Sequence, residues 1–156
     1  MIYWDLDGVL RALPEHVLGY EPTHWNSLRD GKNVIELVNE NPGLCLSAPE
    51  TEYLPIVNNN LSKIHLMTSQ LPGWIPYTNK WLDDHIKIPY EVIYTTSSVE
   101  KLSLLGDNLL VEDFPNFPSY DRIALITRKY NEHLDVPLRI SSVEQFKVFL
   151  DKHVNR

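Results

Sequence analysis

The amino-acid sequence predicts an α/β fold built around a parallel β-sheet. First, short apolar runs rich in β-branched and aromatic residues alternate with longer mixed segments along the 156 residues. Second, most of these runs end directly in acidic or hydroxyl residues, which would gather at one edge of a parallel sheet. Third, a hydrophobic content of 43% and a charged content of 22% are ordinary for a single globular domain.

Five apolar runs are expected to form the strands. They are residues 1–4 (MIYW), 63–67 (KIHLM), 91–94 (EVIY), 108–111 (NLLV) and 122–126 (RIALI). Runs of this kind are typical of strands that are buried on both faces of a sheet, with helices as the crossover connections.

Helices are expected over residues 77–85, after Pro76, and over 33–39, which would end before Pro42. A third is predicted by the capping box Ser141-x-x-Glu144, after which apolar residues recur at helical spacing, namely Phe146, Phe149 and Leu150. The stretch 11–60 has no obvious strand and is rich in Pro, His, Tyr and Trp. We therefore expect a mostly helical insertion there, packed over one edge of the sheet.

Composition and charge narrow the classes of function. The single cysteine, Cys45, excludes a disulfide framework and favours a reducing, cytoplasmic setting. No membrane-spanning segment or signal peptide is expected from the hydropathy pattern. The net charge of −7 argues against binding of long nucleic acid, which depends on Lys and Arg, but it is compatible with a small phosphorylated ligand.

Asp5 and Asp7 follow the first predicted strand and precede Gly8, which allows a sharp turn. Two carboxylates held close together need a cation, or one of them must stay protonated. Such a pair can bind Mg²⁺ and can place an acid or base beside a nucleophile. The alternative is that these residues only form a turn, since Asp and Gly are common in turns.

Hydroxyl and basic residues follow later. Thr68 and Ser69 could bind phosphate oxygens, although hydroxyl residues at a strand end often only cap the next segment. Lys101 could provide a positive charge for phosphate, but by itself it is more typical of a solvated surface residue. Lys63 and Lys80 compete with it for this role.

Glu112 and Asp113 come directly after the very apolar run 108–111. Uncompensated buried charge is costly, so two adjacent acids at this place favour a metal site. A short acidic turn before Pro115 is the alternative.

The order of these residues resembles the haloacid dehalogenase-like (HAD) phosphohydrolase superfamily over most of the chain. Its four motifs look like WDLDGVL (Asp5, Asp7), LMTS (Thr68, Ser69), a lysine matched best by Lys101, and VED (Glu112, Asp113). The resemblance implies a Rossmann-like three-layer sandwich with a parallel sheet. Residues 1–10 and 61–156 would form this core, and residues 11–60 a small cap.

The resemblance also implies a role for each motif. Asp5 would be the nucleophile that forms an aspartyl-phosphate, and Asp7 the general acid and base. Mg²⁺ would be held by Asp5, the backbone carbonyl of Asp7 and the acidic pair, with Asp113 favoured over Glu112 for direct contact. Thr68, Ser69 and Lys101 would bind the phosphate oxygens, with Lys101 also stabilising charge in the transition state.

Within the superfamily, the sequence is most similar to the 5′(3′)-deoxyribonucleotidase group, in the segments DLDGVL, NKWLDDH, GDNLLVED and ALITRKYNEHL. This similarity implies a Mg²⁺-dependent 5′-nucleotidase acting on a nucleoside monophosphate. The alternatives are a sugar-phosphate phosphatase or phosphomutase, or a polynucleotide-end phosphatase. A receiver-like regulatory domain is disfavoured by the order of the acidic residues, and a non-catalytic phosphate-binding module by the presence of every expected residue type.

Aromatic side chains are candidates for substrate specificity. Trp25 and Tyr53 lie in the expected cap and Trp74 lies soon after Thr68. Rings of this kind can stack on a nucleobase. The alternative for each of them is packing of the cap onto the core.

Overall fold

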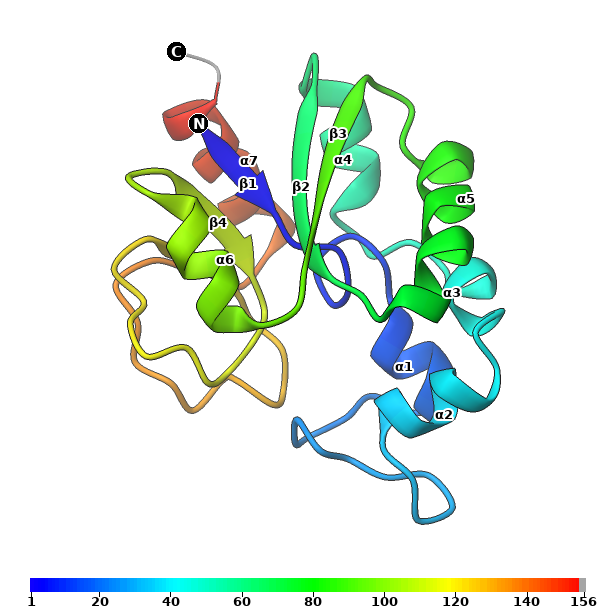
Figure 1. Cartoon of the computed structure of the whole chain (residues 1–156). Helices are drawn as coiled ribbons and strands as arrows, with labels where there is room; N and C mark the ends of the chain where they lie inside the picture. The colour runs from blue at the N-terminus through cyan, green and yellow to red at the C-terminus, as the bar shows by residue number, and fades with distance from the viewer. Residues whose placement is uncertain (155–156) are drawn as a thin grey trace.

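The computed structural model describes residues 1–154 and confirms an α/β fold with a parallel sheet (Figure 1). All pairings within the six-stranded sheet are parallel, and the strand order is β3-β2-β1-β4-β5-β6. The strands are β1 (Ile2–Trp4), β2 (Ile64–Ser69), β3 (Tyr90–Thr95), β4 (Leu109–Glu112), β5 (Ile123–Ile126) and β6 (Arg139–Ile140).

The five predicted strands are all present. The sixth, β6, was not predicted, because a strand of two residues is too short to carry a periodic pattern. It pairs with β5 through Leu125 and Ile126 at the edge of the sheet.

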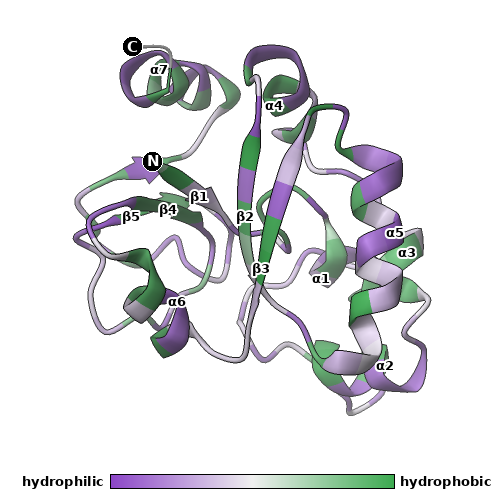
Figure 2. Ribbon diagram, turned by 45° about the horizontal axis from the view of Figure 1, so that its top comes forward, coloured by the Kyte–Doolittle hydropathy of each residue, from purple (hydrophilic) through white to green (hydrophobic). Residues whose placement is uncertain are grey.

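The helices are α1 (Leu13–Leu18), α2 (Val34–Glu40), α3 (Leu44–Ser47), α4 (Leu54–Asn60), α5 (Ile75–His85), α6 (Ser98–Leu105) and α7 (Val143–His153), with a 3-10 turn at Pro72–Trp74. The three predicted helices correspond to α2, α5 and α7. Asn33 begins α2 with a complete capping box, because its side chain accepts from Glu36 N and the Glu36 side chain accepts from Asn33 N. Figure 2 shows hydrophilic and hydrophobic residues on both α5 and α7, as expected for helices with one buried face.

The predicted capping box at Ser141 and Glu144 is wrong by one residue. Ser142 has the extended backbone of an N-cap, and its hydroxyl accepts a hydrogen bond from Gln145 N at 3.2 Å. The Gln145 side chain in turn accepts from Ser141 N at 2.7 Å. The apolar residues predicted for this helix are buried as expected, since both registers place them on the same face.

The sheet separates two hydrophobic clusters. Trp4, Leu66 and Val111 face a cluster that includes residues of α4, α5 and α7. Met67, Leu110 and Leu125 face the opposite cluster, which includes Leu105 of α6 and Phe117. Alternate residues of the strands therefore point to opposite faces, which gives three layers and is consistent with a Rossmann-like sandwich.

Residues 11–60 contain four helices, α1–α4, in accordance with the predicted helical content. The first three, α1–α3, form a hydrophobic cluster of their own with Trp74. In contrast, Leu54 and Val57 of α4 are part of the main core beside the sheet. No helix of the described residues is long and apolar enough to cross a bilayer.

The strand order changes direction next to β1. From β1 the chain first builds outward through β2 and β3, and it then returns to the other side of β1 with β4, β5 and β6. Ligands of open α/β sheets bind at the carboxyl ends of the strands at such a switch point. The ends of β1 and β4, which are paired through Trp4 and Val111, therefore mark the place for a site.

Candidate functional site

A tight loop after β1 begins the site. Asp5 N donates to Val111 O at 2.9 Å, so Asp5 still lies in the ladder with β4. The chain then turns, with Leu10 N and Arg11 N both donating to Leu6 O at 2.8 and 2.9 Å. Gly8 has a φ of +80°, and a Cβ on it would lie 1.8 Å from Asp113 Oδ2. A glycine is required here by the backbone conformation and by the close approach of Asp113.

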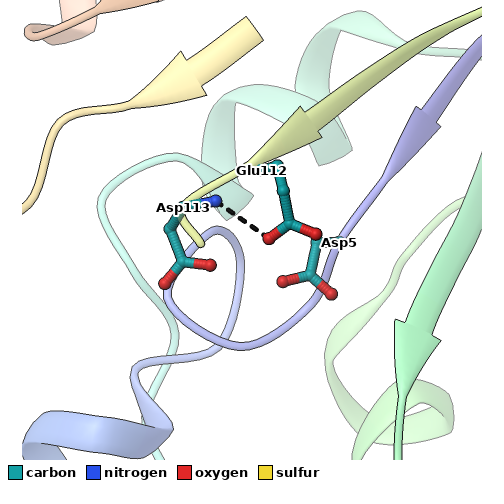
Figure 3. Close-up of side chains that lie close together, drawn as sticks. All are labelled: Asp5, Glu112 and Asp113. Atoms are coloured by element: carbon teal, nitrogen blue, oxygen red, sulfur yellow. Dashed lines mark hydrogen bonds between the residues drawn. The ribbon is translucent and has the colours of Figure 1, made fainter. Parts of the chain in front are cut away.

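Three buried carboxylates meet at the ends of β1 and β4. Asp5, Glu112 and Asp113 each offer an oxygen, and these oxygens lie within 4.8 Å of one another (Figure 3). Glu112 Oε1 accepts a hydrogen bond from Asp113 N at 3.0 Å, which fixes one oxygen of Glu112. We refer to these three residues as the acidic cluster.

Lys101 of α6 contacts the acidic cluster directly. Its Nζ lies 2.8 Å from Asp5 Oδ1 and 2.7 Å from Glu112 Oε2. The two competing lysines are elsewhere, because Lys63 and Lys80 pair with Glu91 and Asp84 on the surface. Of the three lysines considered, Lys101 is therefore the one that the fold brings to the site.

The electrostatics of the acidic cluster leave an excess of negative charge. Burial raises the pKa of Asp5 well above its ordinary value, and the charge of Glu112 adds to this effect. Burial also raises the pKa of Glu112, and burial together with the charge of Asp5 raises the pKa of Asp113 to about 7. Burial opposes the charge of Lys101, but Asp5 and Glu112 outweigh it and raise its pKa. Lys101 thus pairs with two of the three acids, while the third, Asp113, is affected by the charge of Arg128 without an ion pair between them.

This donor set fits a hard divalent cation. Carboxylate oxygens are the ligands that Mg²⁺ prefers, and a positive ion would compensate the charge that Lys101 leaves unbalanced. The predicted metal ligands Asp5, Glu112 and Asp113 are therefore brought together. Asp7, which was predicted as a ligand through its backbone carbonyl, lies in the adjoining loop.

Two residues that sequence reasoning missed support Asp113. The hydroxyl of the buried Tyr130 donates to Asp113 Oδ2, and Asn131 Nδ2 donates to the Asp113 backbone carbonyl at 2.8 Å. Asn131 Nδ2 also donates to Ile126 O, which joins the end of β5 to the site. The sequence offers little signal for Tyr130, because a tyrosine after a strand has no motif that points to a carboxylate.

Asp7 lies in a different environment. Arg11 binds it with two hydrogen bonds, from Nε to Oδ1 at 2.7 Å and from Nη2 to Oδ2 at 3.1 Å. Gln70 Nε2 donates to Asp7 Oδ2 at 2.8 Å. Sequence reasoning missed both partners, although an arginine inside the apolar segment GVLRALP and a polar residue directly after Thr68 and Ser69 were visible signals.

The two hydroxyl residues at the end of β2, Thr68 and Ser69, lie close to Asp5 and Asp7 at the same edge of the sheet. Thr68 is buried, and its Oγ1 accepts from Gln70 Nε2 at 3.0 Å. The Ser69 hydroxyl pairs with the Thr95 hydroxyl at 2.8 Å across the β2–β3 pair. Both line the cavity described next, so both are available to a ligand there.

A cavity of about 400 Å³ extends from the ends of the strands to the helices α1 and α2. Six of the predicted catalytic and binding residues line it, namely Asp5, Asp7, Thr68, Ser69, Lys101 and Glu112. Apolar and aromatic side chains, including those of Leu13, Leu18, Val34 and Phe114, form much of the remaining wall. A cavity of this size can hold most of a small organic ligand.

The three aromatic candidates for specificity have different positions. Trp25 and Trp74 line the cavity. Trp25 is 41% exposed and packs edge-on against Phe114 and Tyr130. Tyr53 is only 3% exposed and packs against Phe146 in the main core, away from the cavity wall as the described residues form it.

The arrangement can bind a phosphoryl group beside a carboxylate. Lys101 and the hydroxyls of Thr68 and Ser69 can hold anionic oxygens, the acidic cluster can hold a cation, and Asp5 and Asp7 offer two carboxylates with different partners. Comparison with family models gives no match to this chain, and no curated protein matches it significantly. The functional assignment therefore depends on the chemistry of the site.

Proposed function

We propose that the protein is a Mg²⁺-dependent phosphomonoesterase of the HAD type that acts through an aspartyl-phosphate on Asp5. The observation that carries this proposal is the Asp5 carboxylate itself. It belongs to the acidic cluster, it is bound by Lys101 at 2.8 Å, and it lines the same cavity as Thr68. A carboxylate that can act as a nucleophile, a lysine that can neutralise charge and a hydroxyl that can donate a hydrogen bond to phosphate thus line the same cavity.

In the first half of the proposed reaction, an Asp5 carboxylate oxygen attacks the phosphorus of the substrate. The P–O bond to the leaving alcohol breaks as the new O–P bond forms. Asp7 gives its proton to the departing alkoxide, so that a neutral alcohol leaves. Lys101 and the Thr68 hydroxyl hold the equatorial oxygens, where negative charge is concentrated.

In the second half, the Asp7 carboxylate takes a proton from water while the water oxygen attacks the phosphorus. The bond between the phosphorus and the Asp5 oxygen breaks, which restores the Asp5 carboxylate and releases inorganic phosphate. Water and phosphomonoester are consumed, and alcohol and phosphate are produced, so the two halves balance.

Asp5, Asp113 and Glu112 would hold Mg²⁺, with Asp113 favoured for direct contact. When bound, the ion neutralises the repulsion between a carboxylate nucleophile and an anionic phosphate. This assignment is supported by the fit of the oxygen donors and by the excess of negative charge at the acidic cluster.

A nucleoside monophosphate is the substrate class that we favour. Trp25, Trp74 and Phe114 line the cavity and could pack against a flat base. Lys101 is the only lysine or arginine among the described lining residues, which suits a single phosphate better than a chain of phosphates. A sugar phosphate is the second candidate, because Asn26, Asn33 and Ser98 offer hydrogen-bonding groups to hydroxyls.

A phosphatase screen tests the proposal. The purified protein should hydrolyse p-nitrophenyl phosphate with Mg²⁺, and EDTA should abolish the activity. A panel of deoxyribo- and ribonucleoside monophosphates, sugar phosphates and phosphorylated oligonucleotide ends then ranks kcat/KM. A preference for a sugar phosphate would exclude the nucleotidase while retaining the phosphatase. A complete lack of phosphate release across the panel would refute the proposed function.

A further inference from the structure

A buried hydrogen-bond network lies beneath Asp7. At its centre is Arg11, which is fully buried and makes five hydrogen bonds. Two go to the Asp7 carboxylate, and the others reach the Cys45 carbonyl, the Thr78 hydroxyl and Gln70 Oε1. A guanidinium has five N–H donors, so every donor of Arg11 is used. The side chain therefore has one defined position.

This network fixes which way the Gln70 amide faces. Gln70 Oε1 accepts hydrogen bonds from Arg11 Nη2 at 3.3 Å and from the Thr78 hydroxyl at 3.0 Å. The Arg11 guanidinium can only donate, so the group of Gln70 that faces it must be the oxygen, and the Thr78 hydroxyl, which accepts from Arg11 Nη1, can donate to the same oxygen. The Gln70 NH₂ group must consequently face the other side, toward Asp7 and Thr68.

The Gln70 NH₂ group then acts on two residues of the proposed site. It donates to Asp7 Oδ2 at 2.8 Å and to Thr68 Oγ1 at 3.0 Å. Because the Thr68 oxygen accepts from Gln70, its own O–H remains available as a donor toward the cavity. Asp7 Oδ2 accepts from both Arg11 and Gln70, which holds the carboxylate plane in one orientation.

We propose that Gln70 is a positioning residue that holds the carboxylate of Asp7 and the hydroxyl of Thr68 in one productive arrangement, with Arg11 and Thr78 setting the direction of its amide. This inference rests on the proposed function, because it assigns to Asp7 the proton transfer and to Thr68 the contact with phosphate. Gln70 is neither the proposed nucleophile nor a member of the acidic cluster. The effect of replacing Gln70 on the reaction can therefore be distinguished from the effect of replacing Asp5.

The test compares two leaving groups in Gln70→Met, which keeps the length of the side chain and removes its hydrogen bonds. A p-nitrophenolate leaves readily without a proton, whereas an alkoxide needs one from Asp7. We expect kcat/KM to fall about 100-fold for the best alkyl phosphate of the screen and at most about tenfold for p-nitrophenyl phosphate. Inhibition by inorganic phosphate should weaken about fivefold, because Thr68 loses its orientation.

Gln145→Met is the matched control. It removes an amide at the start of α7, outside the cavity lining, and should leave both rates unchanged. Thermal unfolding shows whether Gln70→Met is folded. Thr78→Val is a second test, because it removes a hydroxyl that contacts Gln70 but neither Asp7 nor Thr68. It should also lower kcat/KM more for the alkyl phosphate than for p-nitrophenyl phosphate, with a smaller loss than in Gln70→Met.

The outcomes distinguish the inference from the function. Equal losses on both substrates, or no loss, in the folded Gln70→Met protein would refute the positioning role while the phosphatase remained. If the wild-type protein hydrolyses neither substrate, the proposed function fails and the inference fails with it. A selective loss with the alkyl phosphate in both variants would support the inference.

Discussion

Asp5 and Asp7 are only two residues apart, yet they belong to two differently built regions. The side chain of Asp5 is 9% exposed and lies among two further carboxylates with one lysine, Lys101. The side chain of Asp7 is 20% exposed and is bound by the guanidinium of Arg11 and the amide of Gln70. In the first region Lys101 pairs with two of the three acids, and Arg128 acts on Asp113 through its charge alone. In the second region one guanidinium pairs with one carboxylate.

This difference indicates where an added cation is needed. Near Asp7 the carboxylate and the guanidinium balance each other, and every hydrogen-bond donor of Arg11 is used. In the acidic cluster, burial and mutual repulsion raise the pKa values of Asp5 and Asp113. We therefore expect Mg²⁺ and pH to change the stability that the acidic cluster contributes. We expect substitutions in the Asp7 network to act mainly by changing the orientation of its side chains.

The largest effect is expected for Asp5→Asn. An amide is a poor nucleophile, so kcat/KM for p-nitrophenyl phosphate should fall by at least about 10³-fold. The protein should remain folded, because the substitution reduces the negative charge of the acidic cluster. Asp121→Asn, at an exposed residue of the loop before β5, is the matched control and should retain full activity. Full activity of Asp5→Asn would show that Asp5 is not the nucleophile.

Lys101→Met should lower stability most among the lysine substitutions. It leaves Asp5 and Glu112 buried without their cation, and breaking a buried ion pair in this way costs about 3–5 kcal/mol. Chemical denaturation without metal measures the free energy of unfolding. Lys63→Met and Lys80→Met, which break exposed pairs, serve as controls. A Lys101→Met protein as stable as these two would contradict the electrostatic interpretation.

Mg²⁺ should stabilise the folded protein through the acidic cluster alone. A metal ion at about 100 times its Kd raises the free energy of unfolding by about 2.7 kcal/mol, and EDTA should reverse this. Asp113→Asn should lose most of the gain, because a charged ligand is removed. Thr78→Val, on the Asp7 side, should keep it. If Mg²⁺ raised the free energy of unfolding equally in both variants, the ion would have to bind outside the acidic cluster.

The predicted site residues that the fold brings together mostly lie at the end of a strand, within a recognisable motif. Asp5, Thr68 and Glu112 each lie at the end of an apolar run, and strand ends at a switch point must converge. Lys101 has a weaker local signal, because a lysine in an amphipathic segment has the same pattern whether it is buried or exposed. Its ion pairs join residues 96 and 11 positions apart, which no local pattern encodes.

The residues that were missed act through tertiary contacts. Arg11 is close to Asp7 in sequence, but Thr78, 67 positions away, completes its hydrogen bonds. Tyr130 contacts Asp113 from the segment after β5, and only the fold brings the two together. The short strand β6 was missed for a different reason, because two residues are too few to show an alternating pattern. Local periodicity thus predicted the sheet and the edge where the candidate site lies, whereas the supporting hydrogen-bond network could be seen only in the packed structure.

The smallest expected effect is a pH dependence of stability that comes from the acidic cluster. Burial, with the charge of Asp5, raises the pKa of Asp113 from 3.8 to about 7 in the folded protein, while the hydrogen bond from Tyr130 opposes the shift. The folded state then holds a proton that the unfolded state releases above about pH 4. This contribution to stability is fully present below that pH and is lost as pH rises through about 7.

Unfolding of the metal-free protein in EDTA at pH 5 and pH 8 measures this loss. Asp113→Asn removes the titrating group, so the decrease in stability between these two pH values should be smaller than in the wild type. At pH 8 the variant should be more stable than the wild type, because the buried charge of Asp113 is then absent. Asp84→Asn is the control, because Lys80 lowers the pKa of Asp84 through a hydrogen bond, and its slope should not flatten in this range. An unchanged slope in Asp113→Asn would mean that the excess charge is carried by Asp5 and Glu112, and the contrast with Asp7 would then depend on those two residues alone.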